Sequence, residues 1–314
     1  MAISEANKSK KWGLVIDVTR CDGCGSCLLS VKDEYTYNEY PGYCGNQPVD
    51  GYTWLTLKEI EQGHGTKLKM DYVPVMWPHN RNLNTDIPGV PEGAIYVRED
   101  GLTIIDPEKA KGCRALYDYF AKIYNGYQYP AVKEYDSKNK QINNPDVIFW
   151  NEEQQLPQIY ILDAHRLDEG ERIVRCAEDC PTQAMHWGDL NDPESDVSKF
   201  VAAHPDEIED YFQEEGADYV VRYYKLPKPF LAGEVMVCDS ADCVKGAKVT
   251  LTPSCKHGAV RETETDFFGD FEFKGLRLNG TYTVRAEVPG YQPKEVTVTV
   301  DEAKNLGVIT LDKA

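Results

Sequence analysis

Three cysteines with two residues between successive members constrain this chain more than any other feature. Directly after the apolar run Trp12 to Val18 come Cys21, Cys24 and Cys27. The turns between them are loosened by Gly23 and Gly25, so each thiolate can bind a different iron atom of one [4Fe-4S] cluster. The motif therefore predicts an iron–sulfur site, for which it supplies three of the four ligands.

The fourth ligand is expected far downstream. In the bacterial ferredoxin run, a fourth cysteine follows the third by four residues, precedes a proline and binds the other cluster of the pair. The corresponding position here is Val31, and the only cysteine followed by proline is Cys180, before Pro181. By this crossed pattern we assign one [4Fe-4S] cluster to Cys21, Cys24, Cys27 and Cys180. A zinc site and free thiols are the alternatives.

Cys176 is a rival for the fourth ligand. Three residues separate it from Cys180, as between the third and fourth cysteines of a ferredoxin run, which would make Cys176 a ligand of a partner cluster. The other positions of that partner cluster are occupied by Val31, Tyr160 and Asp163. Because one thiolate cannot hold a cubane, we predict that the second site is empty and that Cys176 is a small buried residue.

A second segment repeats the first cysteine motif in degenerate form. Ile16 to Cys24 matches Ile105 to Cys113, with the aspartate, a basic residue, the glycine and one cysteine in register. We interpret this match as an internal repeat, with chance similarity as the alternative. The four ligand positions of the repeat are Ala110, Cys113, Leu116 and Phe120. This apolar set can fill the volume of a cluster but cannot bind iron.

Composition limits the classes of partner and the cellular compartment that we expect for this chain. The chain has 314 residues, enough for two domains, and a formal net charge of -18, which disfavours a nucleic-acid partner. Its ten cysteines do not look like a secreted disulfide framework. Cys238, Cys243 and Cys255, with His257 nearby, are interpreted as free thiols, with a disulfide or a metal site as the alternative. The first eleven residues lack an apolar signal segment, and no window approaches 18 apolar residues. We expect a cytoplasmic protein without a membrane span.

The expected fold class is α+β, with a ferredoxin-like iron–sulfur domain over residues 1–222. The pattern predicts a strand at Trp12 to Val18 and a helix at Leu28 to Tyr35. Residues 37–91 show little periodicity and are interpreted as a long insertion that faces a partner. Its aromatic residues suit an interface: Tyr40, Tyr43, Tyr52, Trp54, Tyr72 and Trp77.

Local sequence patterns predict further helices and strands in the rest of this domain. Residues 94–105 predict a hairpin with Asp100-Gly101 as its two-residue turn. Asp106 is the expected cap of a helix that begins at Pro107 and runs to about Tyr124. Beyond it we expect short strands at 147–150 and 158–162, a loop followed by a helix at 176–187, and one or two acidic helices at 194–215.

The last part of the chain differs in character. Residues 223–231 contain two prolines and are expected to form an extended linker. Residues 232–314 contain seven short alternating segments with turn residues between them, which predict a β-sandwich of immunoglobulin-like or carboxypeptidase-regulatory-like type. No residue in the chain belongs to a convincing acid–base or nucleophile constellation, so no catalytic residue is assigned.

The order of these parts resembles the small iron–sulfur subunit of the pyrogallol-phloroglucinol transhydroxylase type, in the group that accompanies molybdopterin enzymes of the dimethyl-sulfoxide-reductase class. The stretches that carry the resemblance are 15–18, 38–43, 98–101, 105–112 and 265–269. The resemblance implies a heterodimer, or a higher oligomer, with a large catalytic subunit. That subunit would carry molybdenum or tungsten on bis-pyranopterin guanine dinucleotide and act on a polyhydroxylated phenol.

The chain departs from this family at several ligand positions. Small subunits of the family hold several cubanes, and cysteines would be needed here at Val31, Val75, Pro78, Phe120, Tyr160 and Asp163. The sequence therefore favours an electron-transfer subunit with a single cluster. A structural subunit with a redox-inert cluster is the alternative, and a free-standing ferredoxin is disfavoured by the insertion and the appended domain.

Overall fold

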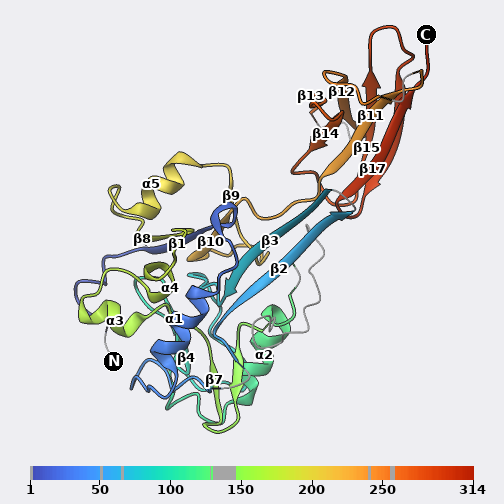
Figure 1. Ribbon diagram of the computed structural model, residues 1–314. Coiled ribbons are helices and arrows are strands. Elements are labelled where there is room, and N and C mark those ends of the chain that lie inside the picture. Colours follow the sequence, from blue (N-terminus) through green and yellow to red (C-terminus); the bar gives the residue numbers. More distant parts are fainter. Residues whose placement is uncertain are drawn as a thin grey trace. The chain divides into compact units, whose positions relative to one another are not determined.

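The computed structural model describes residues 3–49, 52–64, 67–127, 129, 146–239, 242–254 and 259–314. These residues divide into two compact units (Figure 1). The first is built mainly from residues before Pro227, and the second contains Ile60–Met70 together with Pro227–Ala314. Helices and strands are mixed, and strands predominate.

A four-stranded sheet forms the centre of the first unit. Its order is β8 (Met185–Asp189), β1 (Trp12–Asp17), β10 (Val221–Tyr224) and β9 (Ile208–Glu209). The predicted first strand is confirmed, and all six residues of β1 are buried, as expected for an apolar strand inside a sheet. β1 runs antiparallel to β8, with Ile16 opposite Met185, and parallel to β10. The chain that leaves β1 therefore lies beside the chain that enters β8.

Helices flank this sheet. The predicted helix after the cysteine motif is confirmed as α1 (Ser26–Tyr35), and α4 (Arg175–Glu178) packs against it. The expected helix after Cys180 is wrong, because β8 follows there and completes the sheet. The acidic segment 194–215 forms one helix, α5 (Asp196–Ala203), followed by β9. A short helix, α3 (Ala164–Glu169), precedes α4.

The helix predicted from Pro107 begins later than expected. α2 spans Arg114–Tyr124, and residues before it form turns. Asp106 caps one of these turns, because its Oδ1 accepts hydrogen bonds from the backbone N–H groups of Glu108 and Lys109. Gly112 then adopts φ +75°, which interrupts any helix that starts at Pro107.

The aromatic insertion is part of the folded core and not a peripheral loop. It contains the paired strands β2 (Leu55–His64) and β3 (Lys67–Met76). Trp54 and Trp77 are 1% and 0% exposed, and Tyr43 is also buried. The interpretation as a partner-facing surface is therefore wrong for Tyr43, Trp54 and Trp77, because their own chain covers them. The other three, Tyr40, Tyr52 and Tyr72, are half-buried.

Two further hairpins follow. β4 (Ile95–Val97) pairs with β5 (Thr103–Ile105), and β6 (Phe149–Asn151) pairs with β7 (Leu156–Gln158). The first hairpin is confirmed, but its turn is longer than two residues, because the backbone N–H of Arg98 donates to the carbonyl of Leu102. Asp100 does not sit at an exposed tip: it is 1% exposed and ion-paired with Arg98.

The C-terminal β-sandwich is confirmed. One sheet has the order β14 (Asp270–Phe273), β11 (Leu231–Val237), β17 (Lys304–Leu311). The other has the order β13 (Arg261–Glu264), β12 (Lys248–Pro253), β15 (Gly280–Glu287), β16 (Lys294–Val300). Inward residues of both sheets, among them Val235, Val249 and Val284, form one apolar core.

The segment expected as a linker contributes to strands at both ends. Tyr223 and Tyr224 belong to β10, and Leu231 begins β11. In the part of the chain that the structure describes, no helix is both long enough and apolar enough to cross a membrane.

Candidate iron–sulfur site

The three clustered cysteines lie between β1 and α1. A 3-10 helix (Val18–Arg20) ends β1, and Asp17 caps it by accepting hydrogen bonds from the backbone N–H and the hydroxyl of Thr19. Gly23 and Gly25 then adopt φ of +75° and +76° and turn the loop into α1. Along this loop the cysteines differ in exposure: Cys21 is half-buried, Cys24 exposed and Cys27 buried.

Cys180 reaches the same place from a distant part of the chain. It follows α4 and precedes β8, whose pairing with β1 brings the two segments together. The backbone N–H of Asp17 donates to the carbonyl of Ala184 at 2.7 Å, and that of Ala184 donates to Cys180 Sγ at 3.3 Å. The antiparallel pairing of β1 with β8 therefore brings Cys180 close to the cysteine loop, although the two lie far apart in the sequence.

The four thiols interact electrostatically. Burial, together with the nearby Cys180 and Cys24 thiols and Asp22, raises the pKa of Cys21 to about 11. Burial also raises the pKa of Cys27 above its ordinary value, and Cys21, Cys180 and Cys24 add to this effect. A bound metal centre would hold such thiols as thiolates.

A zinc ion and an iron–sulfur cluster require different spacings between the four sulfurs. Tetrahedral zinc with Zn–S bonds of about 2.3 Å would bring the sulfurs to about 3.8 Å from one another. Among the described residues, no group of three or more Cys, His, Asp or Glu side chains converges on one metal-ion position. A cubane needs a wider arrangement, because each thiolate binds a different iron atom.

The positions of a second cluster lie together in the interior and carry one thiol. Val31, Tyr160, Asp163 and Cys176 are all 1% exposed or less. Tyr160 interacts electrostatically with Cys176, and its hydroxyl donates to Asp163 Oδ2 at 3.0 Å. Cys176 is thus a small buried residue, as predicted, and it interacts electrostatically with both Cys27 and Cys180.

The repeat positions form apolar core. Ala110, Leu116 and Phe120 are at most 1% exposed, and Cys113 is 8% exposed. Phe120 makes an edge-to-face contact with Trp77, with ring centroids 5.2 Å apart. Val75 is also buried, so the side chains of this region pack against one another as the apolar set predicts.

Two further cysteines and one buried histidine lie elsewhere in the sequence. Cys238 and Cys243 are exposed free thiols, as expected, and Cys255 and His257 lie outside the described residues. His79 is a buried structural residue: its Nδ1 accepts from the backbone N–H of Thr103, and its Nε2 bonds to the carbonyl of Tyr160. Burial lowers its pKa to about 3.

No local sequence pattern predicts two of the contacts near this site. The ring of Tyr72 packs against Gly23 of the cysteine loop, and the carboxylate of Asp163 accepts from the backbone N–H of Arg175 at 2.5 Å. The first contact joins two distant segments, and the second joins the turn before α3 to the start of α4. The crossed-ligand pattern predicts Cys180 as a ligand, but no spacing rule predicts a contact of Tyr72 or Asp163.

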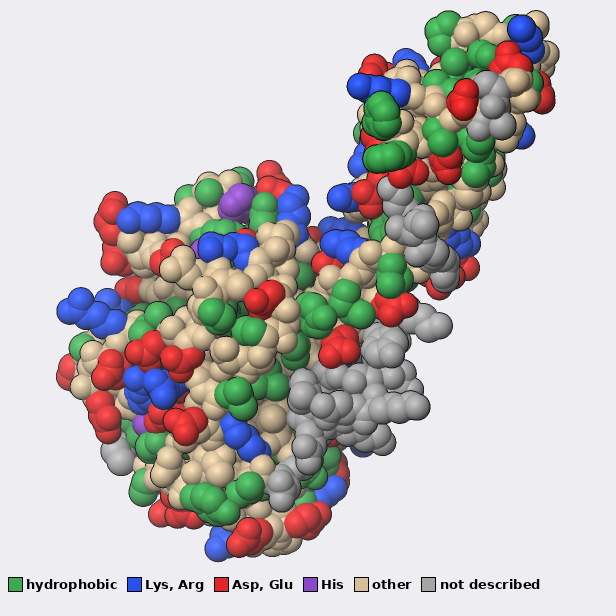
Figure 2. Space-filling model, viewed as in Figure 1, with side chains coloured by type: hydrophobic (Ala, Val, Ile, Leu, Met, Phe, Trp, Pro, Cys, Tyr) green, Lys and Arg blue, Asp and Glu red, His purple; other side chains and the backbone are tan. Residues whose placement is uncertain are grey.

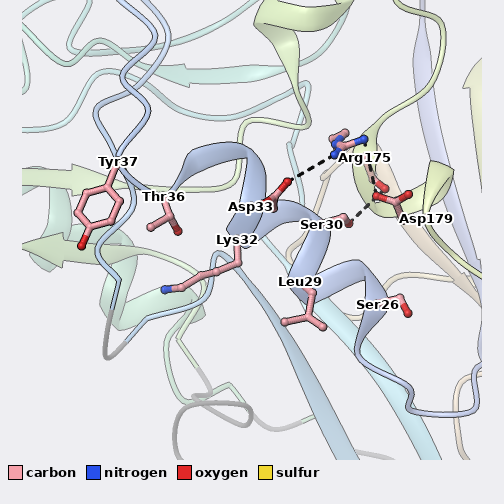
Figure 3. A pocket seen from close by; sticks show the side chains of 9 residues that line it. All are labelled: Ser26, Leu29, Ser30, Lys32, Asp33, Thr36, Tyr37, Arg175 and Asp179. Carbon is pink, nitrogen blue, oxygen red and sulfur yellow. Dashed lines mark hydrogen bonds and ion pairs between the residues drawn. The ribbon is translucent and has the colours of Figure 1, made fainter.

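A hollow of about 740 Å³ lies along α1 next to the cysteine loop (Figure 3). It begins at Ser26, between Cys24 and Cys27, and passes Leu29 and Tyr37, whose side chains are 70% and 77% exposed. Figure 3 shows Arg175 facing Asp33 and Asp179 at its edge. In Figure 2, acidic side chains are spread over the visible face of both units, in keeping with the net charge of -18.

Comparisons with known proteins cover both units. A model of the carboxypeptidase regulatory-like domain matches residues 231–312. The pyrogallol hydroxytransferase small subunit of Pelobacter acidigallici is 30% identical over 317 aligned positions, covering 96% of this chain and 100% of that protein. The putative iron–sulfur subunit of the dimethyl sulfoxide reductase of Halobacterium salinarum is 31% identical, covering 66% of this chain and 76% of that protein.

A third protein is similar over most of its length. A tetrathionate reductase subunit of Salmonella typhimurium is 26% identical and covers 72% of this chain and 77% of its own length. By their names, these relatives are subunits of a hydroxytransferase and of two reductases, and the Halobacterium relative is an iron–sulfur subunit. The chain belongs to the family of small iron–sulfur subunits of the pyrogallol hydroxytransferase type.

Proposed function

We propose that this chain is an electron-transfer subunit whose ferredoxin-like first unit binds a single [4Fe-4S] cluster through Cys21, Cys24, Cys27 and Cys180. The observation that carries the proposal is the β1–β8 pairing, which brings Cys180 to the three-cysteine loop. Since the second set of positions carries one thiol and the repeat carries one, neither can supply four thiolate ligands.

The residues around the thiols set the environment of the cluster. When bound, a [4Fe-4S] cluster accepts and releases one electron at a time. Cys24 is exposed and Cys27 is buried, so these two thiolates would hold the cluster from the protein surface and from the interior, respectively. The N–H of Ala184 donates to Cys180 Sγ, a contact of the kind that tunes reduction potential.

We propose as the partner a large subunit that carries molybdenum or tungsten on bis-pyranopterin guanine dinucleotide, in a heterodimer or a higher oligomer. A polyhydroxylated phenol is the proposed substrate of that subunit. The Pelobacter relative supports this choice, because its match extends over 96% of the chain and includes the C-terminal sandwich. The match to the Halobacterium protein covers 66% of this chain.

The test uses the complex purified without oxygen, with identification of the co-purifying large subunit. We expect about four iron atoms and four sulfides per small chain. An electron paramagnetic resonance signal should appear on reduction and change during turnover with a phenolic substrate. Protein without iron would refute the proposed site. A cluster that stays in one oxidation state throughout turnover would support the structural alternative.

A further inference from the structure

Asp163 occupies a ligand position of the absent second cluster and ties three segments together. Its Oδ1 accepts a hydrogen bond from Tyr35 Oη of α1 at 2.6 Å. Its Oδ2 accepts from Tyr160 Oη at 3.0 Å and from the backbone N–H of Arg175, the first residue of α4, at 2.5 Å. Asp163, Tyr35 and Tyr160 are each 0% exposed, so these hydrogen bonds are shielded from water.

The backbone at Asp163 is held in a conformation that residues with a Cβ seldom adopt. Leu162 and Asp163 have φ of 47° and 52°, both in the left-handed region. Such residues persist where the surrounding structure fixes them, and they gather at sites with a specific task. Here the turn aims the Asp163 carboxylate at the start of α4.

α4 needs an external anchor because it is only four residues long. Its first residue, Arg175, is held on two sides: Asp163 accepts from its N–H, and Ser30 Oγ donates to its carbonyl at 3.3 Å. Ser30 Oγ also contacts the carbonyl of Cys27 at 3.1 Å. α4 leads directly to Cys180, so its position determines where the fourth thiol lies.

We propose that Asp163 is a positioning residue for the iron–sulfur site. Its carboxylate joins α1 to α4 where a second cluster would otherwise do so, and it thereby places Cys180 against the other three thiols. This inference rests on the proposed ligand set. It predicts that removing the contact between Asp163 and the Arg175 N–H changes the cluster itself, and not only the stability of the fold.

Arg175 offers a matched pair of variants. Arg175→Ala keeps the backbone N–H but removes the side chain, which pairs with Glu34, Glu178 and Asp179. Arg175→Pro removes the side chain and the N–H. Proline is tolerated at the first position of a helix, and Val174 before it is extended at φ -81° and ψ 147°, as a residue before proline should be.

The experiment uses the complete complex, with Asp163→Leu, Asp163→Asn and the two Arg175 variants. We measure iron per chain, the paramagnetic spectrum, the alkylation rate of Cys180 and the melting temperature. Asp163→Leu and Arg175→Pro should retain about three irons in place of four, with a three-iron spectrum and at least tenfold faster alkylation. Asp163→Asn and Arg175→Ala should keep the four-iron spectrum, because an acceptor oxygen and the N–H both remain.

The outcomes separate the two claims. Wild-type complex without iron overturns the proposed function and this inference with it. Iron-replete wild type with an unchanged spectrum in Asp163→Leu and Arg175→Pro overturns the positioning role alone, even if both variants melt earlier. If Asp163→Leu does not fold, the comparison of Arg175→Pro with Arg175→Ala decides, and equal spectra in that pair overturn the inference.

Discussion

The ring of Tyr72 lies directly against Gly23 in the cysteine loop. A Cβ on Gly23 would come within 2.6 Å of Tyr72 Cδ1, closer than real Cβ contacts allow. Gly25, two residues on, has nearly the same φ, yet no described atom lies within 4 Å of the position that its Cβ would take. β3 therefore covers the loop at one glycine and leaves the other open.

Gly23→Ala should disturb the site more than Gly25→Ala. Both changes place a Cβ at positive φ, at a cost of about 1–2 kcal/mol in unfolding free energy. Only Gly23→Ala must also displace the Tyr72 ring, so its iron content should fall several-fold while that of Gly25→Ala stays near wild type. Iron per chain in the purified complex measures this. Equal losses in the two variants would contradict the role of Tyr72.

Cys180→Ala and Cys176→Ala distinguish the two candidates for the fourth ligand. Cys180→Ala should lose iron, since it removes a thiolate from the proposed site. Cys176→Ala should keep about four irons and lose about 1–2 kcal/mol of unfolding free energy, because Cys176 is fully buried. Iron analysis and melting curves test both. Loss of iron in Cys176→Ala alone would show that the crossed assignment is wrong.

Phe120→Ala should lower the unfolding free energy by about 3–5 kcal/mol. The Phe120 ring is 1% exposed and contacts Trp77 and Tyr124, so truncation leaves a cavity in the aromatic core. Lys122→Ala, on an outer face of the same helix, is the control and should change stability by at most about 0.5 kcal/mol. Chemical unfolding measures both. A small effect of Phe120→Ala would mean that the repeat region is loosely packed.

The free energy of unfolding should fall in acid, because the carboxylate of Asp168 becomes protonated. Burial raises the pKa of this carboxyl, but hydrogen bonds from Arg98, Asn7, Ser4 and Tyr43 outweigh burial and lower it to about 2. A depressed pKa stabilises the folded state above the unfolded value of about 3.9, and that contribution disappears as pH falls toward 2. We expect a loss of about 1–2 kcal/mol across this window, after discounting for screening by solvent.

Asp168→Asn tests this origin of the acid sensitivity. The variant should be less stable than wild type at pH 7, and the difference should shrink between pH 4 and pH 2 as the wild-type carboxyl is protonated. Unfolding measured across this range gives both curves. Asp118→Asn, at an exposed ion pair on α2, is the control and should run parallel to wild type. A constant difference at every pH would contradict the assignment to Asp168.

Local patterns predicted several elements correctly. The apolar run before Cys21 became β1, and the alternating segments after residue 231 became the two sheets of the sandwich. Errors arose where a local signal competed with a distant contact. The sequence predicts Asp106 as a helix cap, but its side chain closes a turn. The sequence predicts Trp54 and Trp77 as interface residues, but their own chain buries them.

The sequence by itself determined which chemical groups this protein carries: cysteines at a fixed spacing, a Cys-Pro pair downstream, and apolar or aromatic residues at most of the other positions where the family pattern would need cysteines. Tertiary structure alone decided how these parts meet. The register of β1 against β8 brings Cys180 to the loop, Tyr72 covers Gly23, and Asp163 anchors α4. The physical reason is that ligand spacing is a property of adjacent residues, whereas strand register and buried hydrogen bonds depend on packing between distant segments.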